Sequence, residues 1–275
     1  MALTKVLITV KTYPSLSRKY EELVCTAGFR EDGSWIRIYP VPFRKLDIEK
    51  QYRKWEWIEL DLDKRTEDFR PESFRLHDTD EDISILGHID TKNAWKARKE
   101  IALKNVCYNM SELIDAAYDP ARHTSLAVLK PKEIIDFVVE DDERDWDKEK
   151  YAAVMAKQQE LNLFEDTQRI FKIAKKLPYK FSYRFTTEDG KIRKLMIEDW
   201  EIGVLYWNMM TKYQDEKVAC EKVKQKYFDD FAKTKDLYLF VGTSWQFHSM
   251  KSADPFLVIG TFTPPIVSPE EPTLF

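Results

Sequence analysis

The sequence predicts an α+β fold: a curved antiparallel sheet or small barrel near the N-terminus, followed by a helical and β-hairpin region. Short β-branched and aromatic segments crowd residues 5–76, with turn residues between them. Longer helix-like stretches and an Asp-Gly turn follow. We therefore divide the chain into a β-rich region, 1–78, and a mixed region, 79–275, whose last two strands, within 237–262, we expect to rejoin a sheet.

The first region alternates short strands with turns. We expect strands at 5–13, 23–29, 35–40, 57–62 and 73–76, and a helix over 45–54. Pro14 ends the first strand, since proline cannot donate to a sheet ladder. In the third strand Trp35, Arg37 and Tyr39 share one face. We expect that face to be exposed, because a buried arginine without a partner is costly.

The second region mixes long helices with strands. Helices are expected over 95–117, 151–176 and 202–231, and strands over 126–129, 134–140, 179–187, 194–200, 237–243 and 256–262. Ser111 is expected to cap a second helical piece within 95–117. Asp189 and Gly190 provide the turn between the two strands of a hairpin.

Composition excludes several classes of protein. Only 7 of 275 residues are glycine, and neither a phosphate-binding loop of the Gly-x-x-x-x-Gly-Lys type nor a Gly-x-Gly-x-x-Gly loop occurs. The 3 cysteines form no Cys-x-x-Cys pair, which excludes a zinc ribbon. We therefore expect no cofactor and no bound metal. Lys5 and Lys11 interrupt the apolar N-terminal stretch, and no apolar run is long enough to span a membrane, so we expect a cytoplasmic protein without a membrane partner.

Charge is segregated along the chain although the total is only −4. Residues 1–57 hold 11 basic and 7 acidic residues, and residues 167–194 hold 9 basic and 2 acidic residues. The intervening residues 79–166 hold 12 basic and 20 acidic residues. Segregated charge creates a local field that the total hides, so the two basic segments are the candidates for an anionic partner.

Both basic segments also carry aromatic residues, and this combination favours nucleic acid. Aromatic rings stack on unpaired bases while arginine and lysine neutralise phosphates. On the expected helix, Arg169, Lys172 and Lys176 share a face, and on the next strand Lys180 and Arg184 do so. The candidate nucleic-acid-binding residues are Lys11, Tyr13, Arg37, Tyr39, Arg44, Lys172, Lys176, Lys180 and Arg184. The alternative is that the aromatic residues form core and the cations are merely solvated.

The leading hypothesis is that the chain is a non-catalytic, nucleic-acid-binding component of a larger bacterial system. Two further hypotheses stay open. Asp199 and Glu201 would share a strand face, and paired carboxylates can hold Mg²⁺ for phosphodiester cleavage. The lysine that a metal-dependent nuclease would need does not follow Glu201. Alternatively, the acidic run 136–149 and the proline-rich tail from Pro264 would bind protein partners, as in an adaptor.

Several stretches resemble segments of uncharacterised bacterial proteins. They are residues 22–28, 35–44, 70–73 and 197–201, the last reading Ile-Glu-Asp-Trp-Glu. The resemblance implies membership of an uncharacterised family and transfers no activity. Some of those relatives carry a Cys/His cluster before the Asp-Trp-Glu element, whereas residues 186–196 contain neither residue type.

Overall fold

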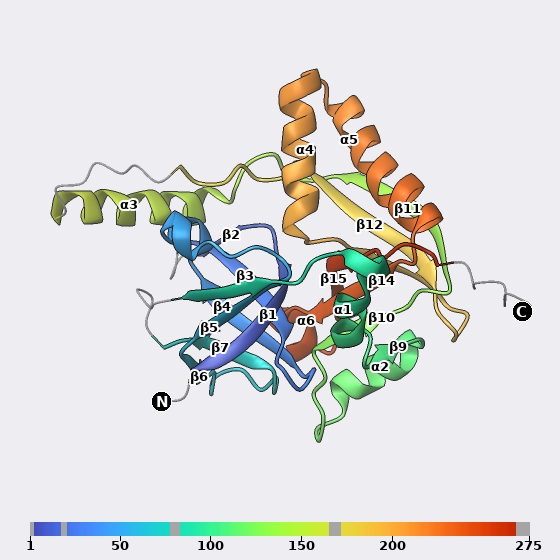
Figure 1. Ribbon diagram of the computed structural model, residues 1–275. Helices are drawn as coiled ribbons and strands as arrows, with labels where there is room; N and C mark the ends of the chain where they lie inside the picture. The colour runs from blue at the N-terminus through green and yellow to red at the C-terminus, as the bar shows by residue number, and fades with distance from the viewer. Residues whose placement is uncertain (1–2, 18–20, 78–82, 165–171, 268–275) are drawn as a thin grey trace, which may run out of the picture.

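A computed structural model describes residues 3–17, 21–77, 83–164 and 172–267 of the chain. The fold is α+β, as predicted, and the N-terminal strands form a strongly curled half-barrel (Figure 1). No helix in these ranges is both long and apolar enough to cross a lipid bilayer.

The half-barrel is an eight-stranded sheet in the order β6-β7-β4-β3-β1-β5-β8, with β2 paired to β3. Its strands are β1 (Thr4–Lys11), β2 (Ser15–Ser17), β3 (Glu21–Phe29), β4 (Trp35–Val41), β5 (Glu56–Leu60), β6 (Leu62–Lys64), β7 (Ser73–Leu76) and β8 (Ser84–His88). β8 extends this sheet beyond residue 78, the end of our β-rich region. Neighbouring strands are antiparallel except β4 and β7, which are parallel.

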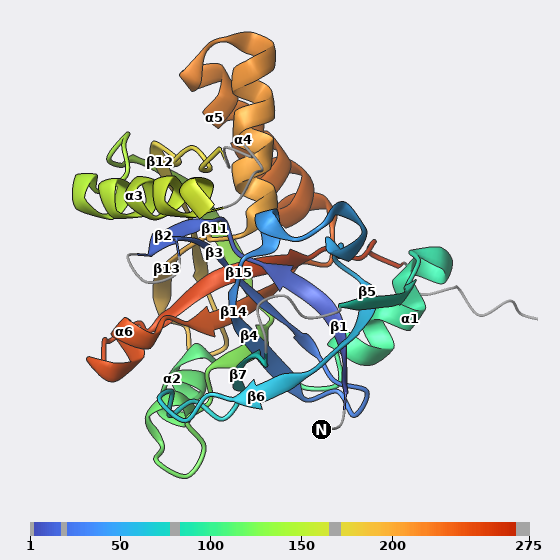
Figure 2. The same ribbon diagram turned by 90° about the vertical axis from the view of Figure 1, so that its left-hand side faces the viewer.

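Both faces of the half-barrel are buried. Val6 and Ile8 pack inside its curve with Ile36 and Ile38. Leu7 and its neighbours on the opposite face pack against a four-stranded sheet in the order β15-β14-β10-β9, and Figure 2 shows the two sheets against each other. The four strands are β9 (Val106–Cys107), β10 (Leu126–Leu129), β14 (Tyr238–Thr243) and β15 (Phe256–Phe262).

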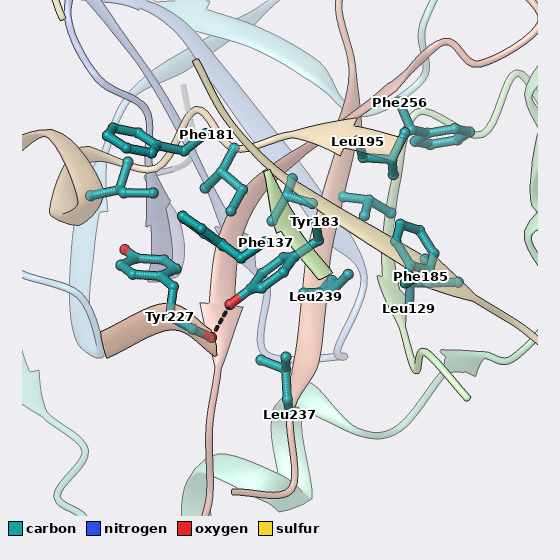
Figure 3. Close-up of a cluster of buried hydrophobic side chains, with 14 of the residues drawn as sticks. Leu129, Phe137, Phe181, Tyr183, Phe185, Leu195, Tyr227, Leu237, Leu239 and Phe256 are labelled. Carbon is teal, nitrogen blue, oxygen red and sulfur yellow. Dashed lines mark hydrogen bonds between the residues drawn. The ribbon is translucent and has the colours of Figure 1, made fainter. Parts of the chain in front are cut away.

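A second core lies between a three-stranded sheet and the C-terminal helices. The sheet has the order β11-β12-β13, with bounds β11 (Glu133–Asp141), β12 (Tyr179–Thr186) and β13 (Ile192–Met196). Phe181, Tyr183 and Phe185 alternate onto its buried face, and the Tyr183 hydroxyl donates to the Tyr227 carbonyl at 2.6 Å (Figure 3). Lys180 and Arg184 consequently share the outer face, as their spacing predicts.

Helices fill the remaining connections. They are α1 (Lys92–Ala102), α2 (Met110–Tyr118), α3 (Lys148–Phe164), α4 (Trp200–Tyr213), α5 (Glu216–Lys224) and α6 (Trp245–Ser249), with a π-helix, η3 (Gln225–Ala232), after α5. The expected helix over 202–231 is broken at Gln214, which is left-handed, and Asp215 caps α5. Asn109 rather than Ser111 caps α2. Only the short turns η1 (Phe43–Lys45) and η2 (Ile48–Lys50) lie near the helix expected over 45–54.

The expected helix over 151–176 is wrong at its C-terminal end. Residues 172–177 are not helical, and Arg169 lies outside the described residues. Backbone groups of this segment bond to the N-terminal half instead: Ala174 N–H donates to the Glu22 carboxylate at 2.6 Å, and the Lys172 carbonyl accepts from Arg44 at 3.0 Å. These bonds replace the helical ones, so Lys172 and Lys176 do not share a helix face.

Candidate functional site

A cavity of about 440 Å³ lies where the half-barrel meets the second half of the chain. On one side it is lined by the turn after β1 and by strands β3 and β4. The segment after β11, the residues around β12 and β13, and strands β14 and β15 line it from the other. Its volume falls within the range of about 300–1,000 Å³ that is usual for small-ligand pockets.

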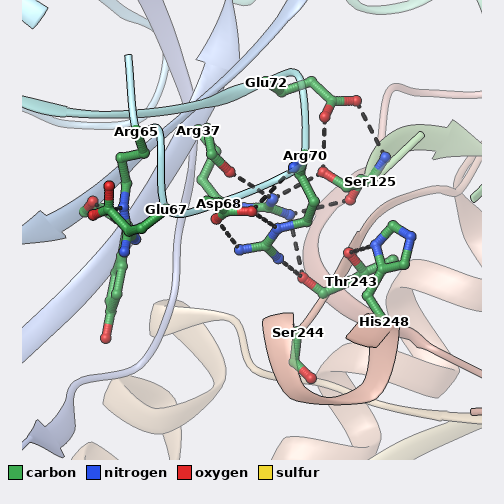
Figure 4. Close-up of polar contacts among 12 residues, drawn as sticks. Arg37, Arg65, Glu67, Asp68, Arg70, Glu72, Ser125, Thr243, Ser244 and His248 are labelled. Atoms are coloured by element: carbon green, nitrogen blue, oxygen red, sulfur yellow. Dashed lines mark hydrogen bonds and ion pairs between the residues drawn. The ribbon is translucent and has the colours of Figure 1, made fainter. Parts of the chain in front are cut away.

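Two buried arginines, Arg37 and Arg70, contribute to the wall of the cavity. Figure 4 shows their polar contacts. Arg37 donates to the Ser125 hydroxyl at 2.8 Å and to the Ser125 carbonyl at 3.1 Å. Arg70 forms a two-pronged ion pair with Asp68. Both guanidinium groups also donate to the carbonyl of Thr243, at 3.3 and 2.7 Å respectively. The two arginines of the half-barrel thus bind one backbone oxygen of the other half.

The expected exposure of the Arg37 face is therefore wrong. Arg37 is 4% exposed, because that face of β4 packs against the second half of the chain. Burial, together with the nearby charge of Arg70, lowers the pKa of Arg37 to about 10. The penalty for burial is met by acceptors that the sequence could not associate with β4, namely oxygens of Ser125 and Thr243.

Glu198 lines the same cavity and differs from the other charged residues there. Its backbone is fixed, since its N–H donates to the Val258 carbonyl and its carbonyl accepts from Tyr13 N–H. Its carboxylate makes no hydrogen bond or ion pair with the described residues. Burial raises the pKa of Glu198. Burial likewise raises the pKa of the Cys25 thiol, and the charge of Glu198 adds to that effect.

Aromatic and basic residues surround the rest of the cavity. The aromatic lining residues are Tyr13, Tyr39, Trp146, Tyr179 and Trp245, the last 54% exposed. Lys176 and Lys180 each pair with Asp142, at 2.7 and 3.0 Å. Although burial opposes it, the hydrogen bonds from these lysines lower the pKa of Asp142.

Five of the nine predicted binding residues line this cavity: Tyr13, Arg37, Tyr39, Lys176 and Lys180. Arg44 and Lys172 also meet, since Arg44 donates to the Lys172 carbonyl while pairing with Glu22 at 2.7 Å. Arg184 lies exposed on the outer face of β12 and pairs with no acidic residue in the described ranges. The two basic segments, separated in the chain, therefore come together at one place.

Lys11 lies elsewhere, in a cluster with Lys54, Asp199 and Glu201. Lys11 Nζ sits over the Phe43 ring, 4.1 Å from its centroid, and burial and the charge of Lys54 lower its pKa to about 8. Lys54 Nζ lies 2.7 Å from Asp199 Oδ1 and 2.9 Å from Glu201 Oε2.

Asp199 is fully buried and caps α4, whereas the Glu201 side chain is 57% exposed. A metal-dependent nuclease would need a lysine close to Glu201. The sequence after Glu201 contains none, but the fold brings Lys54 to Glu201. Among the residues that the structure describes, no three His, Cys, Asp or Glu side chains group as a metal site would require.

Sequence reasoning missed Arg70, Glu198, Trp146 and Trp245 as cavity residues. Arg70 and Glu198 both fall within stretches that carry the resemblance to bacterial proteins, which is the only signal that marks them. Trp146 lies within the acidic run 141–149 and Trp245 is the first residue of α6, and neither position has a sequence signal that indicates a cavity.

The chain matches two family models, each described as a domain of unknown function. DUF8758 matches residues 2–104, and DUF8757 matches residues 107–275. The chain belongs to the DUF8757 family. The cavity lies at the junction of the two matched regions. No curated protein matches the chain.

Two solved structures show a weak overall likeness. One is a murine DNA binding protein bound with ds DNA, with 8% identity, a TM-score of 0.33, and coverage of 98% of this chain and 100% of that chain. The other is the tetrameric p202 HIN2, with 10% identity, a TM-score of 0.29, and coverage of 97% and 92%. Likenesses at this level do not establish a common fold.

Proposed function

We propose that the chain binds nucleic acid through the surface where its two basic segments meet. The observation that carries the proposal is the convergence of Tyr13, Tyr39, Lys176 and Lys180 on one cavity. These residues come from segments more than a hundred positions apart, and they combine the rings that stack on bases with the cations that neutralise phosphates.

The outer face of β12 extends this surface. Lys180 lies at the cavity, and Arg184 follows it on the same face of the strand. In the sheet, Arg184 stands between Lys194 of β13, which pairs with Glu140 at 2.9 Å, and Asp136 of β11. Because Arg184 forms no ion pair with Asp136 or with any other described residue, its charge is available to a phosphate. A strand leaving the cavity would run over this face.

The chain acts in this proposal as a non-catalytic, cytoplasmic component of a larger bacterial system. The nuclease hypothesis remains a prediction that Mg²⁺-dependent cleavage assays test. The full burial of Asp199 speaks against it, since a phosphodiester cannot approach that carboxylate without rearrangement. The adaptor hypothesis also remains a prediction, and residues 268–275 of its tail lie outside the described residues.

The test is fluorescence anisotropy with short labelled oligonucleotides, single-stranded and duplex, DNA and RNA, from about 50 to 200 mM salt. Arg184→Ala is expected to weaken binding and to lower the salt slope by about one. Lys217→Ala is the matched control, because Lys217 is an exposed cation on α5, which contributes nothing to the cavity. Absence of binding to every oligonucleotide, or equal losses in the two variants, would refute the proposal.

A further inference from the structure

The cavity offers an acceptor that lacks a donor. Glu198 lines the wall, is half-buried, and has no hydrogen-bond partner among the described residues. A carboxylate that faces a cavity can accept hydrogen bonds from a ligand that enters it. The occupant that fits Glu198 therefore brings N–H or O–H donors.

The positions of the charged residues indicate the orientation in which that occupant would bind. Lys176 precedes β12 and Lys180 lies within it, on the outer face that also carries the exposed Arg184. Lys176 and Lys180 share one carboxylate, Asp142, so these three cations keep a net positive charge that attracts phosphate groups, whereas Glu198 repels them. A nucleotide would therefore keep its phosphates along β12 and direct its base towards Glu198.

The lining also suits a flat, unsaturated ring. Tyr13, Tyr39, Trp146 and Trp245 supply aromatic surface, and the volume of about 440 Å³ can hold one base with its sugar. Enzymes and readers that act on single bases hold the extruded base between aromatic or apolar side chains and recognise its Watson–Crick edge.

We infer that the cavity accepts one unstacked nucleobase and that Glu198 selects bases carrying an exocyclic amino group. Glutamate accepts from the amino group of cytosine in protein–DNA contacts. Thymine and uracil present carbonyl oxygens where cytosine presents that amino group, and those oxygens would face the carboxylate. The inference rests on the proposed function, and it adds a base preference that phosphate contacts alone cannot produce.

The test compares oligo-dC with oligo-dT, two pyrimidine strands of equal length and charge, in anisotropy titrations at neutral pH. The wild-type chain is expected to prefer oligo-dC by on the order of tenfold, as one good base contact allows. Glu198→Gln should remove most of this preference, chiefly by weakening oligo-dC binding. Thermal unfolding of the variant, followed by circular dichroism, confirms that it is folded.

Glu188→Gln is the matched control for the loss of one negative charge. Glu188 is exposed in the turn between β12 and β13, and it does not line the cavity. This variant should keep the cytosine preference. Equal binding of both strands by the wild type, with Arg184→Ala still weakening both, would overturn the base pocket and leave the proposed function intact. Failure to bind either strand or any other nucleic acid would overturn both.

Discussion

Asp199 uses only one of its two carboxylate oxygens. Oδ1 pairs with Lys54 and accepts from the Glu201 N–H, whereas Oδ2 is buried and has no hydrogen-bond partner in the part of the chain that the structure describes. Burial, only partly offset by the charge of Lys54, raises the pKa of Asp199 to about 6. These contacts fasten the start of α4 to the loop before β5, which is a structural role.

We therefore expect Asp199→Asn to lower the free energy of unfolding by about 1–3 kcal/mol, because the substitution disturbs a buried acceptor network. Glu201→Gln serves as the control: its side chain is 57% exposed, so its pair with Lys54 should contribute less than about 1 kcal/mol. Urea unfolding measures both. Nucleic-acid affinity of the folded Asp199→Asn protein should stay near the wild-type value. A catalytic role would instead require wild-type Mg²⁺-dependent cleavage that this variant loses at a normal melting temperature.

At the scale of single residues, the sequence indicates which side chains carry charge and ring surface but not what they contact. The predicted residues Tyr13 and Lys180 do line the cavity. Arg37 does too, but buried rather than exposed, because its acceptors lie about 90 and 200 positions away in the chain. Glu198 could not be recognised from the sequence, since its distinguishing feature is a missing partner.

Helix α4 packs against Tyr13, a residue that lines the cavity, at Gly203. A Cβ added at Gly203 would overlap the ring of Tyr13, whose hydroxyl donates to the Lys175 carbonyl at 2.7 Å and accepts from Trp207 at 3.0 Å. Alanine in place of glycine usually stabilises a helix by about 1 kcal/mol. At Gly203 the overlap with the Tyr13 ring makes the same substitution destabilising instead.

Gly203→Ala is accordingly expected to destabilise the chain by about 1–3 kcal/mol through overpacking. In a Tyr13→Ala background the same substitution should cost little, since the ring is gone, and a double-mutant cycle in urea unfolding measures this coupling. Stabilisation by Gly203→Ala in the wild-type background would contradict the close contact.

At the scale of elements, strands were easier to predict than helices. β4, β10 and β12 are bounded by turns or prolines and built from β-branched and aromatic residues, so local pattern defines them. The segment 172–177 has helix-forming composition, yet its backbone bonds to Glu22 and Arg44. Tertiary contacts of this kind override local preference and leave no trace in sequence periodicity.

Across the whole molecule, the ion pair of Asp68 with Arg70 stands at the junction of the two halves. Although burial opposes it, Arg70 lowers the pKa of Asp68 from 3.8 to about 2. Between pH 3.8 and about 2, Asp68 is protonated in the unfolded chain but ionised in the folded chain. The stabilisation by the ion pair is therefore present above about pH 4 and is lost as the pH falls towards 2. Above about pH 4 the pair should contribute about 2 kcal/mol to the free energy of unfolding.

The expected result is a wild-type free energy of unfolding that falls more steeply below pH 4 than that of Asp68→Asn. Urea unfolding at a series of pH values measures the difference. Parallel curves for the two proteins would show that Asp68 ionises normally. The cavity beside this pair could not be predicted from sequence, because it exists only when the half-barrel and the second half assemble.

The carbonyl of Thr243 accepts from both Arg37 and Arg70. A backbone oxygen is present whatever side chain the position carries. Sequence drift at residue 243 can therefore alter the hydroxyl contact with His248 while the arginine contacts persist. An insertion or deletion within β14 would instead move the oxygen away from both guanidinium groups at once. Relatives of this chain should thus differ in the residue they carry here far more readily than in the length of the strand that holds it.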